Sequence, residues 1–182
     1  REAARAFFTL DYLGHERVSI MDGGVAAWRA AGNALTNDAP RVRRGSFAPR
    51  VRTTVVADAA WIQPRLGRAG MFLLDTRTPE EYAGTGARGG IPSKGHLQGA
   101  QLVQWQDYVS GTDDQRLKSR EALQELLRAR GVAKTDTLVA YCYIGYRASV
   151  SYFVSRLLGY PAKLYDGSYD DWAKRELPLV KP

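Results

Sequence analysis

The chain has 182 residues, of which 45% are hydrophobic and 25% are charged, a composition typical of a soluble globular protein. No stretch approaches the roughly 18 consecutive apolar residues that a membrane-spanning helix requires, and a single cysteine excludes an internal disulfide framework and a cysteine-cluster zinc site. We therefore expect no membrane partner, no metal and no other cofactor. The net charge of +7 leaves an anionic substrate or a nucleic acid as the partner that charge would attract.

The first 35 residues repeat a pattern found at the other end of the chain. The block from Asp22 to Trp28 recurs from Asp166 to Trp172, 144 positions later (22 to 166, 28 to 172). In both copies a helical pattern, a Leu-Gly pair and a short strand come first, and we expect both tryptophans to anchor a core. Residues 1–35 therefore resemble the last third of a domain, so we expect the chain to be the C-terminal piece of a longer protein.

So short a tail buries little apolar surface by itself. We expect residues 1–35 to need packing on the rest of the chain, or a second chain that carries the missing front part of their domain. The favoured hypothesis is the second chain: the N-terminal fragment of the same protein, cut in an exposed loop and still bound.

Residues 36–52 are interpreted as a linker. Their arginines, between positions 41 and 52, are accompanied by Pro40 and Pro49, which is typical of a solvated connection and not of a nucleic-acid patch. We expect no nucleic-acid partner, and the positive charge then favours a small anionic substrate.

Residues 53–182 alternate between strand and helix patterns. We expect strands at 53–56, 71–75, 101–103 and 137–141, and helices at 57–66, from 79, at 119–130 and at 148–158. Short apolar runs such as Met71–Asp75 are typical of buried parallel strands. The alternation predicts an α/β domain with a mostly parallel sheet, and active sites of such sheets form at the carboxyl ends of the strands.

Cys142 stands at such an end, after the strand 137–141 and before the helix that starts near Arg147. The loop between them contains Gly145, which can adopt the backbone angles of a tight cradle. Successive N–H groups in a loop of this kind, together with those of the helix start, bind anions. A buried, inert thiol is the alternative, but loop, glycine and arginine together favour a reactive cysteine.

Four stretches of the sequence then resemble, in order, the signatures of the rhodanese family: LLDTRTPEEYAG (73–84), GHLQGA (95–100), YCYIGYRAS (141–149), and YDGS (165–168) with Trp172. The resemblance covers about residues 53–182, and residues 1–35 resemble the end of a second rhodanese unit. It implies an open parallel sheet with helices on both faces and a partial second copy at the N-terminus. The whole resembles a tandem-domain thiosulfate sulfurtransferase, in which 1–35 belong to a first, non-catalytic domain and 53–182 form the catalytic one.

The resemblance also implies roles for individual residues. Cys142 would attack the outer sulfur of thiosulfate, expel sulfite, and pass the sulfur from a persulfide to a small thiol or cyanide. The residues expected to bind the substrate are Tyr143, Ile144, Gly145, Tyr146, Arg147 and Arg77. Asp75 and His96 are expected to support the site, and bracing is the interpretation we favour for Arg77 as well.

Two departures from the family pattern keep alternatives open. Tyr143 and Ile144 are neither basic nor small, so 3-mercaptopyruvate remains a second possible donor. Glu81 stands where a basic residue often precedes the tyrosine, and Arg147 is the residue expected to supply the missing positive charge.

A Cdc25-like phosphatase would need five residues between cysteine and arginine, and this loop has four. A non-enzymatic sulfur-relay module is the last alternative. The arginine excess hints at a bacterium, and either cytoplasm or periplasm stays possible.

Overall fold

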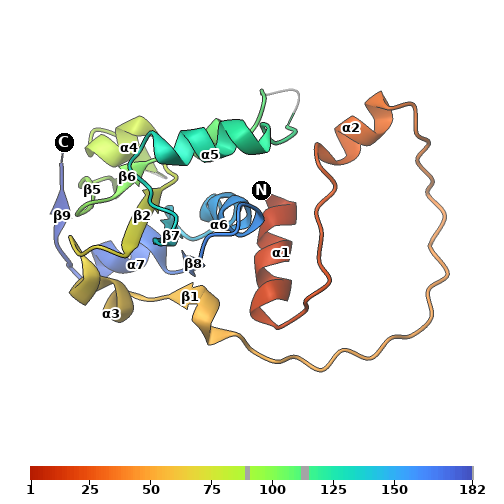
Figure 1. Cartoon of the computed structure of the whole chain (residues 1–182), viewed down its shortest axis with the longest axis horizontal. Helices are drawn as coiled ribbons and strands as arrows, with labels where there is room; N and C mark the ends of the chain where they lie inside the picture. Colours follow the sequence, from red (N-terminus) through yellow and green to blue (C-terminus); the bar gives the residue numbers. More distant parts are fainter. Residues whose placement is uncertain (89–90, 112–114, 182) are drawn as a thin grey trace.

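The computed structural model describes residues 1–88, 91–111 and 115–181. Its centre is a sheet of five strands in which every neighbouring pair is parallel (Figure 1). From one edge to the other the strands are β1 (Val56–Ala57), β8 (Ala162–Tyr165), β7 (Thr137–Tyr141), β2 (Met71–Asp75) and β6 (Gln101–Leu102). The α/β class with a parallel sheet is confirmed.

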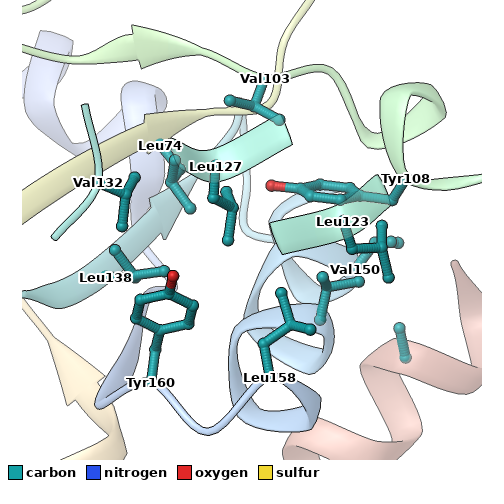
Figure 2. Close-up of a cluster of buried hydrophobic side chains, with 12 residues drawn as sticks. Leu74, Val103, Tyr108, Leu123, Leu127, Val132, Leu138, Val150, Leu158 and Tyr160 are labelled. Carbon is teal, nitrogen blue, oxygen red and sulfur yellow. The ribbon is translucent and has the colours of Figure 1, made fainter. Parts of the chain in front are cut away.

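Side chains of the central strands alternate between two cores. Leu73 and Val139 belong to the cluster on one face of the sheet. The helices that cover this face are α3 (Ala59–Ile62) and α7 (Ser168–Lys174). Leu74 and Leu138 belong to the opposite cluster, under α5 (Arg120–Arg128) and α6 (Ala148–Leu157); Figure 2 shows this second cluster. Because successive residues of a strand point to opposite faces, one apolar run such as Met71–Asp75 serves both cores. Helices therefore cover both faces, as expected.

Shorter elements complete the region 53–182. They are α4 (Pro79–Ala83), the 3₁₀ turns η1 (Thr53–Val55), η2 (Gln63–Arg65) and η3 (Trp105–Tyr108), and two antiparallel pairs: β3 (Ala87–Arg88) with β4 (Ile91–Pro92), and β5 (His96–Leu97) with β9 (Leu179–Val180).

Two expected elements differ at the entry to this region. The strand expected at 53–56 is mostly the turn η1, and only Val56 and Ala57 pair with β8. The helix expected at 57–66 begins later, because Asp58 caps it by accepting the N–H of Trp61 at 2.7 Å. It ends early, in η2, where Pro64 provides no N–H.

The N-terminal helix α1 (Glu2–Tyr12) packs on α6. Phe7 meets Phe153 edge-on at 4.8 Å between ring centroids, and Phe8 meets Tyr152 edge-on at 5.0 Å. The carboxylate of Asp11 accepts the hydroxyl of Tyr152 at 2.5 Å. The first helix is thus an integral layer of the structure.

The rest of the N-terminal region is different. Helix α2 (Gly24–Ala30) has no buried residue, and Figure 1 shows it apart from the sheet, at the end of a long extended segment. Trp28 is 41% exposed, whereas Trp172 is fully buried. The expectation of a core anchor is therefore right for Trp172 and wrong for Trp28, because no described strand lies against α2.

Candidate active site

The site lies at the carboxyl ends of β2 and β7. These strands end side by side, with Asp75 opposite Tyr141. The hydroxyl of Tyr141 donates to Asp75 at 2.6 Å, and burial together with the carboxylate charge raises the pKa of Tyr141 well above its usual range. Tyr141 therefore stays protonated as a donor, and it fixes the edge from which Cys142 emerges.

Arg77 holds the same edge from within. Its guanidinium donates to both carboxylate oxygens of Asp75, at 2.7 Å from Nη2, and to the carbonyl of Gly95 at 2.9 Å and the hydroxyl of Ser93 at 3.1 Å. The side chains of Arg77 and Asp75 are both 0% exposed. In this structure the guanidinium of Arg77 is therefore enclosed by protein groups, a position that favours a bracing role over contact with a substrate.

His96 also has a bracing position. Its ring stacks on Tyr82 at 3.6 Å between centroids, and its Nδ1 lies 3.0 Å from the carbonyl oxygen of the same tyrosine. Both contacts join β5 to α4. The supporting role of His96 stays a prediction, and these contacts hold its imidazole against α4.

Cys142 is 1% exposed and directly follows β7. Its N–H donates to the hydroxyl of Ser168 at 3.2 Å, and its carbonyl accepts the N–H of Tyr169 at 3.0 Å. Ser168, at the start of α7, has φ of +55°, a left-handed conformation that costs free energy in a non-glycine residue. The start of α7 thus fixes the cysteine backbone, and Ser168 is a supporting residue that the sequence analysis missed.

The loop after Cys142 forms a cradle of backbone N–H groups. Among the described residues, none accepts a hydrogen bond from the amides of residues 143–147. Gly145 has φ of +80°, and a Cβ there would lie 2.6 Å from Oδ1 of Asp166, so only glycine fits. Unpartnered amides at a helix start provide partial positive charge, and this loop can therefore hold an anion over the sulfur.

The side chains of the loop point in different directions. Ile144 is 53% exposed. Tyr143 lies beneath the guanidinium of Arg88, whose Cζ is 5.1 Å from the ring centroid, and Tyr146 contacts the first turn of α1 through Glu2. The hydrogen bonds of its own helix start and of Tyr146 hold the pKa of Glu2 at about 2. Tyr143, Ile144 and Tyr146 form the rim of the site, and the amides of the loop form its floor.

Arg147 does not offer a free charge. Its Nη1 and Nη2 donate to the two carboxylate oxygens of Glu81 at 2.7 and 2.9 Å, and the two side chains are 11% and 8% exposed. The expectation that Arg147 supplies an uncompensated positive charge is therefore corrected. Glu81 was seen in the sequence only as a departure, because nothing in a sequence pairs residues 66 positions apart.

Arg88 is the exposed cation that the sequence analysis missed. It lies on β3 and, besides the ring of Tyr143, it has no ion pair with any described residue. No local motif distinguishes it from the other arginines. Only the fold of the loop 84–88 toward Tyr143 brings it to the site.

Two further observations limit the chemistry. The described part of the chain contains no group of three or more His, Cys, Asp or Glu side chains that could hold a metal ion, and none of its helices is long and apolar enough to cross a membrane.

A cavity of about 470 Å³ lies between the N-terminal segment and α6, lined by Ala4, Ile20, Trp105 and Phe153 among others. Cys142 is not among its lining residues.

The model of the rhodanese-like domain matches residues 58–175. The chain belongs to the rhodanese-like family. It is 39% identical over 175 residues to a "Probable 3-mercaptopyruvate sulfurtransferase" of Pseudomonas aeruginosa, covering 93% of this chain and 60% of the relative. It is 32% identical over 172 residues to a "Thiosulfate sulfurtransferase" of the same organism, with 93% and 62% covered.

The chain thus spans about three fifths of the length of these sulfurtransferases. Among solved structures, wild-type EanB superposes with a TM-score of 0.86 at 26% identity, over 98% of this chain and 44% of EanB. Another EanB structure, with a TM-score of 0.86 and 25% identity, is described as a cysteine persulfide in a tetrahedral intermediate state with ergothioneine. The rhodanese resemblance is therefore confirmed, and the relatives carry the names of two sulfurtransferases that differ in their sulfur donor.

Proposed function

We propose that this rhodanese transfers the outer sulfur of thiosulfate through a persulfide on Cys142 to a small thiol or cyanide. The observation that carries the proposal is a buried cysteine followed in its loop by five backbone amides that have no partner among the described residues. In the first step the Cys142 thiolate forms a bond to the outer sulfur, the S–S bond of thiosulfate breaks, and its electron pair leaves on sulfite. In the second step the acceptor takes that sulfur and the electron pair returns to Cys142.

The proposed roles follow from the geometry. The amides of 143–147 hold the persulfide or the donor oxygens, as an oxyanion hole does. Arg88 binds the anionic end of the donor at the rim, above Tyr143, and the net charge of +7 draws anions toward the protein. Tyr143, Ile144 and Tyr146 shape the entrance. Asp75, Arg77 and His96 support the strand ends from which Cys142 emerges.

3-Mercaptopyruvate is the second candidate donor. Two observations favour it: Glu81 compensates Arg147, so that the arginine over Tyr143 at the rim is Arg88, and one relative carries that activity in its name. A singly charged carboxylate suits a single arginine. The sulfur-relay alternative also has a relative, the "Sulfur carrier protein TtuD" of Thermus thermophilus, 34% identical over 192 residues. No feature of the described site favours a phosphatase.

A single-turnover experiment separates these functions. The protein is mixed with thiosulfate or with 3-mercaptopyruvate in the absence of acceptor, and the sulfite or pyruvate released is counted per mole of protein. A stoichiometric burst with thiosulfate, absent in Cys142→Ala, supports the first proposal. A burst with mercaptopyruvate alone supports the second. No burst with either donor, together with loading by a persulfide-bearing protein, indicates a relay module.

We also propose that residues 1–35 are the end of a first, non-catalytic rhodanese unit, joined by the linker 36–52 to the catalytic unit 53–182. The bounds of the terminal helices support this: α2 spans 24–30 and α7 spans 168–174. The indole N–H of Trp28 donates to the carbonyl of Ala34 at 2.9 Å, as that of Trp172 does to Pro178. In this hypothesis the front part of the first unit, as a second chain, covers α2.

Native mass spectrometry tests the second chain. A complex heavier than 20.2 kDa, whose extra component is the front part of the same protein, would support it. A monodisperse particle of that mass, in which hydrogen exchange finds α2 protected, would show that the tail needs no partner.

A further inference from the structure

Glu81 and Arg147 form a buried ion pair next to the proposed sulfur carrier. Glu81 is fixed from two sides, since its Oε2 accepts both Nη1 of Arg147 at 2.7 Å and the N–H of Thr78 at 2.9 Å. The second contact belongs to the capping box that starts α4. Because a capped helix start holds the carboxylate in place, the carboxylate in turn determines where the guanidinium lies.

One nitrogen of that guanidinium has no partner. The pair with Glu81 occupies Nη1 and Nη2 of Arg147, and its Nε is buried without a hydrogen-bond acceptor among the described residues. Leaving a buried donor unpaired costs free energy, so such a group points to a ligand that the site holds during its reaction. The side chain of Arg147 also interacts with that of Cys142, whose charge and hydrogen bond are among the causes that raise the pKa of Arg147.

The charges around the pair agree with this direction. Burial alone would lower the pKa of Arg147, but the hydrogen bonds and charge of Glu81, joined by the charge of Cys142, outweigh it and raise that pKa. Burial by itself would raise the pKa of Glu81. This effect is outweighed by the opposite effects of Arg147, the Thr78 amide and Arg77, so the pKa of Glu81 is lowered. Arg77 is itself compensated by Asp75. Glu80, exposed on the same helix turn, also interacts with the charge of Glu81, and Tyr141 interacts with Arg77.

We propose that Glu81 is a positioning residue for sulfur transfer: it holds Arg147 against Cys142 and compensates the arginine's charge. The proposal rests on Cys142 being the sulfur carrier. In the release step the acceptor thiolate forms a bond to the outer persulfide sulfur, the bond from that sulfur to Sγ breaks, and its electron pair returns to Sγ. An uncompensated guanidinium would retain the anionic persulfide and slow this step. Without the guanidinium, only the loop amides would stabilise the anionic sulfur.

The direct test measures ionisation of Cys142 without any sulfur donor. Iodoacetamide is neutral and Cys142 is the single cysteine of the chain, so the alkylation rate against pH reports this thiol alone. Glu81→Gln removes the negative charge and should move the midpoint of the curve down by about one pH unit. Arg147→Gln removes the positive charge and should move it up by about one unit. Glu80→Gln, an exposed neighbour on the same helix turn, is the matched control and should leave the midpoint in place.

Opposite shifts identify an electrostatic role, because a purely structural role would move both midpoints the same way or neither. Shifts of the same sign, or none, in folded variants would overturn the proposal. Glu81→Asp keeps the charge and shortens the reach. It should restore the wild-type midpoint and most of the wild-type rate of sulfur release, and it also covers the case in which Glu81→Gln does not fold.

The two half-reactions then separate this proposal from the proposed function. With thiosulfate, Glu81→Gln should load Cys142 at a rate near that of the wild type and release the sulfur to a thiol about tenfold more slowly. Equal release rates would contradict the role of Glu81 even where the alkylation midpoints shift. If the wild-type protein forms no persulfide, the sulfur-carrier function fails, while the alkylation result still decides whether Glu81 and Arg147 set the charge at Cys142.

Discussion

Replacing Arg77 by methionine should destabilise the fold and leave sulfur transfer by the folded fraction largely intact. The substitution removes the guanidinium contacts to Asp75, Gly95 and Ser93. The Asp75 carboxylate, 0% exposed, would keep only the Tyr141 hydroxyl and one backbone N–H. Breaking a buried ion pair by removing one partner costs about 3–5 kcal/mol, a large part of the roughly 5–15 kcal/mol that stabilises a typical domain.

The measurement is urea denaturation, followed by circular dichroism, in parallel with single-turnover sulfite release per mole of folded protein. For a chain of this size each kcal/mol lowers Tm by roughly 2–4 °C, so a fall of about 6–20 °C is expected. Arg88→Met is the matched control: it removes an exposed arginine and should leave the free energy of unfolding within about 0.5 kcal/mol of the wild type. An Arg77→Met variant that keeps its stability but cannot use thiosulfate would refute the buried, bracing role.

Three further outcomes follow from the same structure. Arg88→Met should raise KM for the anionic donor about tenfold, in line with the loss of one charge-assisted contact, and leave the rate of alkylation of Cys142 by a neutral reagent unchanged; an unaltered KM would place the donor elsewhere. Phe8→Ala, which removes the ring packed on Tyr152, should cost about 3–5 kcal/mol in urea denaturation, and a cost under about 1 kcal/mol would show that α1 is not part of the folded unit. The pKa of Glu81 is lowered in the folded state, so the ionised carboxylate contributes to stability above the unfolded pKa near 4.5, and this contribution is lost as the pH falls below that value. The difference in unfolding free energy between wild type and Glu81→Gln should therefore shrink from pH 6 to pH 3. A constant difference would contradict this.

The sequence predicted the parts of the fold that depend on local pattern. The strands Met71–Asp75 and Thr137–Tyr141 have the expected bounds, because short apolar runs ending in a polar residue are read from neighbouring residues alone. The loop after Cys142 was found for the same reason: cysteine, glycine and helix start lie within six positions. The two-residue strands β3, β4, β5 and β9 carry no such pattern, since tertiary contacts alone hold them.

The errors at the site concern charge and not position. Arg77, Arg88 and Arg147 are the same residue type, and the sequence gives no sign of which one is compensated. Arg77 meets Asp75 across two positions, Arg147 meets Glu81 across 66, and Arg88 meets neither. Trp28 failed as a core anchor because burial depends on the strands that lie against a helix, and no described strand lies against α2. Local pattern identified the loop of Cys142, and the fold decided which cations remain exposed around it.

The most direct test of the central claim is the mass of the peptide that contains Cys142 after the protein has been incubated with thiosulfate and then separated from it. If Cys142 carries the transferred sulfur, this peptide gains the mass of one sulfur atom, and the gain disappears when a thiol or cyanide is added. It should be absent in Cys142→Ala and present in Arg88→Met at high donor concentration. An unmodified peptide under conditions in which sulfite is released would contradict the assignment of Cys142 as the sulfur carrier.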